Sequence, residues 1–105
     1  MDTVADLHVL RERIDQKDTF LIVLWREADP DIARYLSRLE RLTRQYPPLQ
    51  SFSLCLDTHP TAAARFGAFQ PPAVVIYARG HMVLKISNTY DIAAVRDKLD
   101  RIYSS

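Results

Sequence analysis

Two uninterrupted apolar segments constrain the fold of this chain more than any other feature. They are Phe20–Trp25 and Ala73–Ala78, and each has six residues. Their β-branched and aromatic residues predict strands, and the lack of alternation indicates that both faces of such a strand are covered. A run of six residues is also too short to span a membrane as a helix. We therefore expect a sheet whose central strand is Phe20–Trp25.

Four other stretches carry helical signals. Apolar residues recur three or four positions apart in residues 5–16, from residue 29 to 46, and from about residue 89 to the C-terminus. Asp29-Pro30 predicts the start of the second helix, because Asp accepts bonds from free backbone N–H groups and Pro suits the first helical position. A short Ala-rich helix over residues 61–66 should end at Gly67.

Two further strands complete the pattern. Apolar residues alternate with small ones over residues 51–57, with Cys55 near the middle, and Arg79-Gly80 should turn the chain into a strand over residues 81–86. The predicted order is α-β-α-β-α-β-β-α. A parallel crossover followed by a hairpin gives an α/β fold with a mixed four-stranded sheet and helices on both faces. We expect one domain over residues 1–105.

Charge and cysteine content exclude several functions. The chain has 14 Lys and Arg against 13 Asp and Glu, so its formal charge is +1, which argues against a general polyanion binder. We expect no nucleic acid or membrane partner, and a cytoplasmic location, since no signal peptide pattern is present. A single cysteine excludes an internal disulfide, a CxxC pair and a Cys-rich zinc site. We expect no metal and no cofactor.

Several short motifs carry a family resemblance that extends over nearly the whole chain. They are Leu24-Trp25 at the end of the first apolar strand, Asp57-Thr58-His59-Pro60, Phe66-Gly67, Pro72, and Tyr77 followed by Gly80. Their spacing resembles that of thioredoxins. The resemblance implies the thioredoxin fold, although the N-terminal strand of that family has no room before Ala5.

The resemblance does not extend to the reactive motif of the family. Thioredoxins carry Trp-Cys-Gly-Pro-Cys after this strand, whereas this chain has Ala28-Asp29-Pro30-Asp31-Ile32, so Asp29 and Ile32 take the places of the two cysteines. Val23 stands where active members have a buried carboxylate. Disulfide exchange needs a thiolate at a helix N-terminus and a second thiol to resolve the mixed disulfide. We therefore expect a divergent, CxxC-lacking member without dithiol-disulfide oxidoreductase activity, and we assign no catalytic residue.

The resemblance also implies a partner-binding surface. In thioredoxins the proline at the Pro72 position is cis, and the residue before it offers its backbone to an extended peptide. The leading hypothesis is therefore a protein- or peptide-binding adaptor or accessory factor. Pro71 lacks an N–H group for such pairing, and Ser87-Asn88 lies near a glycine position of the family. The candidate binding residues are Trp25, Ala28, Asp29, Gln70, Pro71, Pro72 and Ala73.

Alternative functions remain open at this stage. Cys55 could act alone as a residual redox thiol in cell redox homeostasis, or it is an inert packed side chain. The chain could instead be a structural subunit of a self-associating complex; otherwise a monomer or weak homodimer is expected.

Two groups of charged side chains also have alternative interpretations. Glu27, Asp29 and Asp31 could bind a cation or a basic segment, or they cap the helix. A row formed by Arg34, Arg38 and Arg41, with Arg44 beside it, could receive phosphates or an acidic partner, or it is a solvated face.

Overall fold

The elements follow the predicted order with one addition at the N-terminus. The computed structural model describes residues 1–104. Its elements are β1 (Asp2–Thr3), α1 (Leu7–Asp15), β2 (Phe20–Trp25), α2 (Ile32–Thr43), β3 (Gln50–Cys55), α3 (Ala62–Phe66), β4 (Ala73–Ala78), β5 (His81–Ser87) and α4 (Ala93–Tyr103).

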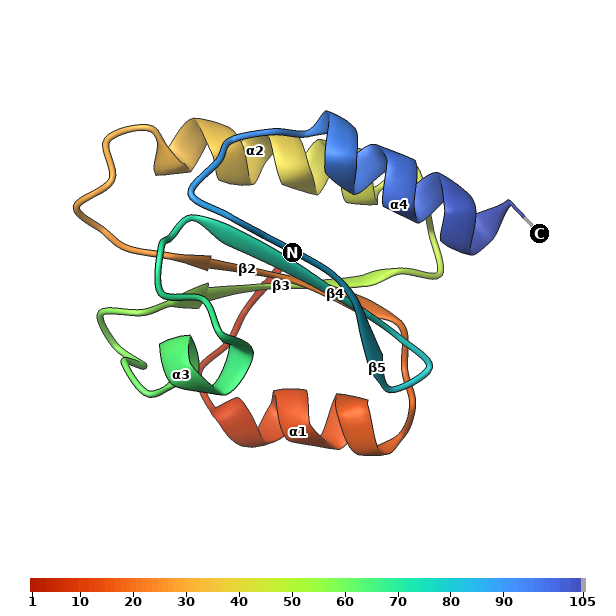
Figure 1. Cartoon of the computed structure of the whole chain (residues 1–105), viewed down its shortest axis with the longest axis horizontal. Coiled ribbons are helices and arrows are strands. Elements are labelled where there is room, and N and C mark those ends of the chain that lie inside the picture. The colour runs from red at the N-terminus through yellow and green to blue at the C-terminus, as the bar shows by residue number, and fades with distance from the viewer. Residues whose placement is uncertain (105) are drawn as a thin grey trace.

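The sheet is mixed, as predicted, but it has five strands rather than four. Its order is β1-β3-β2-β4-β5, with β1 and β2 parallel to β3, and β4 antiparallel to both β2 and β5 (Figure 1). The expectation that no strand fits before Ala5 was wrong. Asp2 pairs with Phe52, and the Val4 N–H donates to the Ser53 carbonyl at 2.8 Å. The two residues of β1 are exposed, so no hydrophobic pattern marks them.

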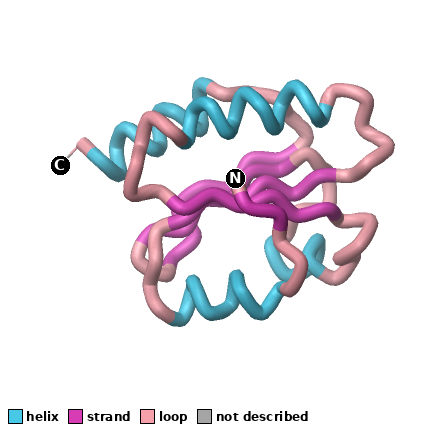
Figure 2. Tube along the Cα trace, turned by 180° about the vertical axis from the view of Figure 1, so that it is seen from behind, coloured by secondary structure: helices cyan, strands magenta, loops and turns pink. Residues whose placement is uncertain are grey.

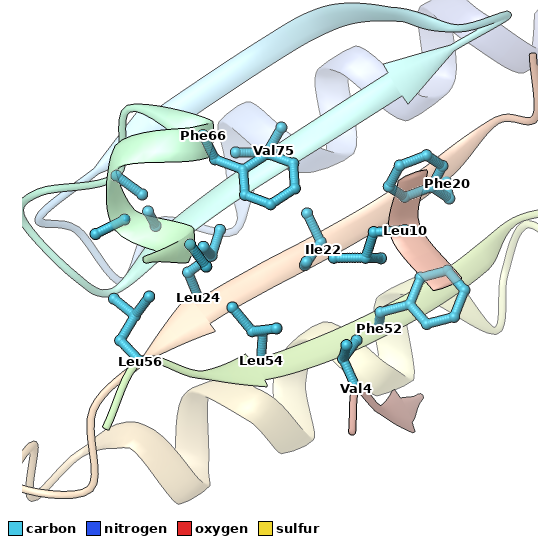
Figure 3. Close-up of a cluster of buried hydrophobic side chains, with 14 residues drawn as sticks. Val4, Leu10, Phe20, Ile22, Leu24, Phe52, Leu54, Leu56, Phe66 and Val75 are labelled. Carbon is cyan, nitrogen blue, oxygen red and sulfur yellow. The ribbon is translucent and has the colours of Figure 1, made fainter. Parts of the chain in front are cut away.

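Helices cover both faces of the sheet, which confirms the predicted α/β class. α1 and α3 lie on one face, and α2 and α4 lie side by side on the other (Figures 1 and 2). The packing of β2 explains its uninterrupted apolar run. Phe20, Ile22 and Leu24 pack toward α1 and α3 (Figure 3), whereas Leu21 and Val23 pack toward α2 and α4. Both faces are therefore apolar, and no alternation is visible in the sequence.

The helices begin later than the sequence predicts. Asp29 does not start α2; its side chain accepts the N–H of Asp31 at 3.0 Å and builds the turn before the helix. Asp91 does the same before α4, accepting the N–H of Ala93 at 2.8 Å. After α2, the Tyr46 N–H donates to the carbonyl of Thr43, three residues back, at 3.1 Å. The last turn of the predicted helix is therefore a tighter 3₁₀-type turn rather than an α-helical one. No helix among residues 1–104 is long and apolar enough to cross a membrane.

The hairpin between β4 and β5 forms at the predicted turn. Arg79 and Gly80 have φ values of 55° and 85°, the left-handed region that suits a two-residue hairpin loop. Beyond the turn, the register between the two strands shifts at Ile76 and Tyr77, which marks a β-bulge. β5 forms the outer edge of the sheet.

Candidate functional site

The predicted binding residues meet at one end of the sheet. β2 runs antiparallel to β4 with Leu24 opposite Ala73, so the end of β2 lies beside the start of β4. The β2–α2 loop and the α3–β4 loop therefore lie at the same end of the molecule (Figure 1). We call this end the strand-end surface, and it comprises Trp25, Ala28, Asp29 and residues 69–73.

Not every residue predicted for binding is accessible there. Ala28 and Gln70 are exposed, and Trp25, Asp29 and Pro71 are half-buried. The side chains of Pro72 and Ala73 are buried, so they shape the surface from below and cannot contact a partner directly. The sequence predicts correctly at which end of the sheet these two residues lie. It does not distinguish residues that support the surface from residues that could contact a partner.

Asp29, in the turn before α2, has hydrogen bonds on both carboxylate oxygens. One oxygen accepts the Asp31 N–H, and the other accepts the Tyr90 hydroxyl at 2.5 Å. This hydrogen bond to Asp29 raises the pKa of Tyr90 to about 12. Ile32 is buried. Neither Asp29 nor Ile32 carries a thiol.

Tyr90 is a site residue that sequence reasoning missed. It lies 61 residues after Asp29, in the connection between β5 and α4. Its ring packs edge-on against Tyr35 with centroids 5.4 Å apart. No spacing pattern links such distant positions, so only the strand order could have indicated that the two connections share one end of the sheet.

The backbone of residues 70–72 has little capacity left for pairing with an extended peptide. The Asn88 N–H donates to the carbonyls of Gln70 and Pro72, at 2.8 and 3.0 Å. The peptide bond between Pro71 and Pro72 is cis, and neither proline has an N–H group. The Pro71 carbonyl is an acceptor with no partner among residues 1–104. Contacts with a partner at this end therefore depend mainly on side chains.

Phe69 gives the strand-end surface its largest apolar contact area. Its side chain is 68% exposed, compared with 40% for Met82, the next most exposed large hydrophobic residue among residues 1–104. The sequence does not reveal this exposure, because Phe69 lies in a loop where no periodicity separates buried from exposed positions. Trp25 packs against the core on the α2 and α4 side, where its Nε1–H is buried and has no acceptor among residues 1–104.

Cys55 is buried, but it is the last residue of β3 rather than a mid-strand residue as predicted. Its thiol donates to the Asp57 carboxylate, with Sγ 3.7 Å from Oδ2. The same carboxylate accepts the Glu27 N–H at 2.7 Å and pairs with Arg26 at 3.7 Å. Reactive thiols lie beside cations or helix N-termini. The direct polar partner of Cys55 is instead an anion that ties the end of β3 to the β2–α2 loop.

We expect Cys55 to be slow to react in the native protein. Burial should make its reaction with Ellman's reagent at least about tenfold slower in buffer than in urea, because the reagent must await local opening. In the insulin reduction assay with dithiothreitol, the protein should not accelerate precipitation. Rapid native labelling, together with insulin turnover that disappears in Cys55→Ser, would instead establish the single-thiol redox alternative.

The remaining charged candidates separate into two groups. Glu27, Asp29 and Asp31 make no side-chain cap on α2, and no cluster of three or more potential metal ligands occurs within residues 1–104. Arg44 forms an ion pair with Glu40 at 3.2 Å, one turn back on α2. Arg38 and Arg41 line a groove that Arg96 of α4 also lines, and Arg34 lines an adjoining cleft.

Comparison with known proteins identifies the fold. No family model matches the chain, and no curated protein matches it in sequence. A crystal structure of a designed protein superposes with a TM-score of 0.86 at 22% identity, over 96% of this chain and 95% of that one. Mitochondrial thioredoxin 3 from Saccharomyces cerevisiae gives 0.85 at 19% identity, over 96% and 94%. Fasciola hepatica thioredoxin gives 0.85 at 17% identity, over 96% and 98%. The chain has the thioredoxin fold.

Proposed function

We propose that this protein is a redox-inactive thioredoxin-fold module that binds a protein or peptide partner through the strand-end surface, as an adaptor or accessory factor. The observation that carries the proposal is the exposure of Phe69 directly before the segment from Gln70 to Pro72. In this fold the same end of the sheet is where Asp29 and Ile32 replace the cysteines, so binding there does not depend on thiol chemistry.

The energetics favour contact through side chains. Burying a phenylalanine ring against a partner contributes about 2 kcal/mol, and aromatic residues often dominate binding at protein interfaces. The carbonyl of Pro71 is an acceptor without a partner among residues 1–104. The partner would therefore supply an apolar side chain for Phe69, with a donor beside it.

Peptide selection tests this proposal. A phage library of random dodecapeptides is selected on the protein, and affinities of the enriched peptides are measured by titration. Binding should change the emission of Trp25, the only tryptophan, because it lies at the surface concerned. Phe69→Ser should weaken binding by at least about tenfold, as expected for a central aromatic contact. The matched control is Met82→Ser, an exposed apolar residue on β5.

The other outcomes are also informative. Failure to enrich any peptide, or equal affinities for the wild type and Phe69→Ser, would reject the strand-end surface as a binding site. Sedimentation velocity addresses the self-association alternative. A dimer that is lost in Phe69→Ser but not in Met82→Ser would mean that a second copy of the chain covers Phe69 instead of a different partner.

A further inference from the structure

A second surface lies along α2 and α4, the two helices that lie side by side on one face of the sheet (Figure 1). A groove of about 270 Å³ is lined by Arg38, Arg41, Leu42, Gln45, Ile92 and Arg96. It adjoins a cleft of about 290 Å³ lined by Asp31, Arg34, Tyr35, Arg38 and Tyr90. Arg38 lines both, so the groove and the cleft are neighbours.

The arginines of this groove have no neutralising partners. Within residues 1–104, none of Arg34, Arg38, Arg41 and Arg96 has a carboxylate oxygen within 4.0 Å. Three of these arginines, Arg38, Arg41 and Arg96, line the groove itself, whose lining includes no acidic residue. The nearest acidic side chain in the two linings is Asp31, which belongs to the adjoining cleft.

The shape and floor of the groove limit what can occupy it. Leu42 and Ile92 are buried and form an apolar floor between the arginines. A volume of about 270 Å³ accommodates one or two side chains rather than a large organic ligand. All the cations around it are arginines, whose planar guanidinium groups can bind a carboxylate with two hydrogen bonds each.

We propose that the α2–α4 groove binds an acidic segment of a partner protein, in which carboxylates flank one apolar side chain. The apolar side chain would contact Leu42 and Ile92, and the carboxylates would pair with Arg38, Arg41 and Arg96. A nucleic acid fits less well. No aromatic ring lines the groove itself, although Tyr35 and Tyr90 line the adjoining cleft. Asp31 in that cleft and a formal charge of only +1 disfavour a polyanion.

The experiment measures binding of a defined acidic peptide. A fluorescein-labelled heptapeptide with a central leucine between two runs of three glutamates is titrated with the protein in about 0.15 M salt, where screening acts beyond about 8 Å. Fluorescence anisotropy gives the affinity. Combined Arg38→Ala and Arg41→Ala should weaken binding about tenfold, since each exposed pair contributes a few-fold. Arg44→Ala, at the residue that caps the C-terminus of α2 and pairs with Glu40, should change it less than about twofold.

Three further ligands decide among the possible occupants. Replacing the central leucine by serine should weaken binding, whereas a lysine heptapeptide should not bind. Oligothymidylate should bind more weakly than the acidic peptide. The proposal is overturned if the acidic peptide shows no saturable binding, or if Arg44→Ala weakens its binding as much as the double variant does. It is also overturned if the serine peptide binds with equal affinity, or if oligothymidylate binds as tightly through the same arginines. Circular dichroism establishes that each variant is folded, and an unchanged response of Phe69→Ser separates this groove from the strand-end surface.

Discussion

Replacing Phe20 by alanine should lower the free energy of unfolding by about 3–5 kcal/mol, the usual cost of removing a buried aromatic side chain. Phe20 is fully buried at the start of β2. Its ring stacks on Tyr77 of β4, with centroids 5.1 Å apart, and meets Phe52 of β3 edge-on at 5.8 Å. The substitution would therefore leave a cavity where three strands share one cluster (Figure 3).

The matched control is Phe69→Ala, which removes the same atoms from an exposed position. Because the Phe69 side chain is 68% exposed, we expect a change within about 0.5 kcal/mol. Urea unfolding followed by circular dichroism measures both variants. A loss below about 1 kcal/mol for Phe20→Ala would contradict the packing described here. An equal loss for Phe69→Ala would mean that Phe69 is retained for stability, and this would weaken the case for a binding role.

The second large effect concerns alkaline pH. Burial raises the pKa of Tyr35 to about 12, and the Asp91 carboxylate adds to this shift. The folded protein therefore holds the phenolic proton more tightly than the unfolded chain, whose tyrosines titrate near pH 10. The resulting stabilisation is complete below pH 10 and is lost as the pH rises toward 12. Tyr35 should contribute about 2 kcal/mol, after allowance for solvent in the cleft that it lines.

Urea unfolding at pH 8, 10 and 12 tests this expectation. The wild type should lose stability steeply above pH 10, and Tyr35→Phe should lose about 2 kcal/mol less over the same interval because it has no phenolic proton there. Tyrosine absorbance at 295 nm, recorded in parallel, should show ionisation above pH 10 until the protein unfolds. If the two proteins lose stability equally between pH 10 and 12, Tyr35 is not the group responsible.

Most of the fold could be predicted because burial on both faces leaves a direct record in the sequence. The apolar runs of β2 and β4 and the helical spacing of α2 identify the sheet and the helices that cover it. β1 could not be predicted, because two exposed residues carry no periodicity and their pairing depends on the position of β3. The start of α2 was misplaced because an Asp side chain can cap a helix or close the turn before it, and the two uses look alike in sequence.

The candidate site could be predicted only in part, for a related reason. The resemblance places Asp29 after the end of β2 and Pro72 before the start of β4. These two positions lie at the same end of the sheet because β2 and β4 are antiparallel neighbours. The contact between Asp29 and Tyr90 joins connections far apart in the chain, and the exposure of Phe69 depends on how its loop leaves the core. Both are properties of tertiary packing, for which a single sequence contains no periodic signal.

The bulge in β5 opposes the pairing of a further strand, from another molecule, with this edge of the sheet. β5 is an outer edge, and a flat edge strand with free backbone groups is a template for aggregation. Here the register shift at Ile76 and Tyr77 interrupts the regular ladder, and Lys85 places a charge within the strand. Desolvating that charge and matching an irregular backbone would both oppose strand addition. This edge therefore opposes fibril-like growth through addition of further strands.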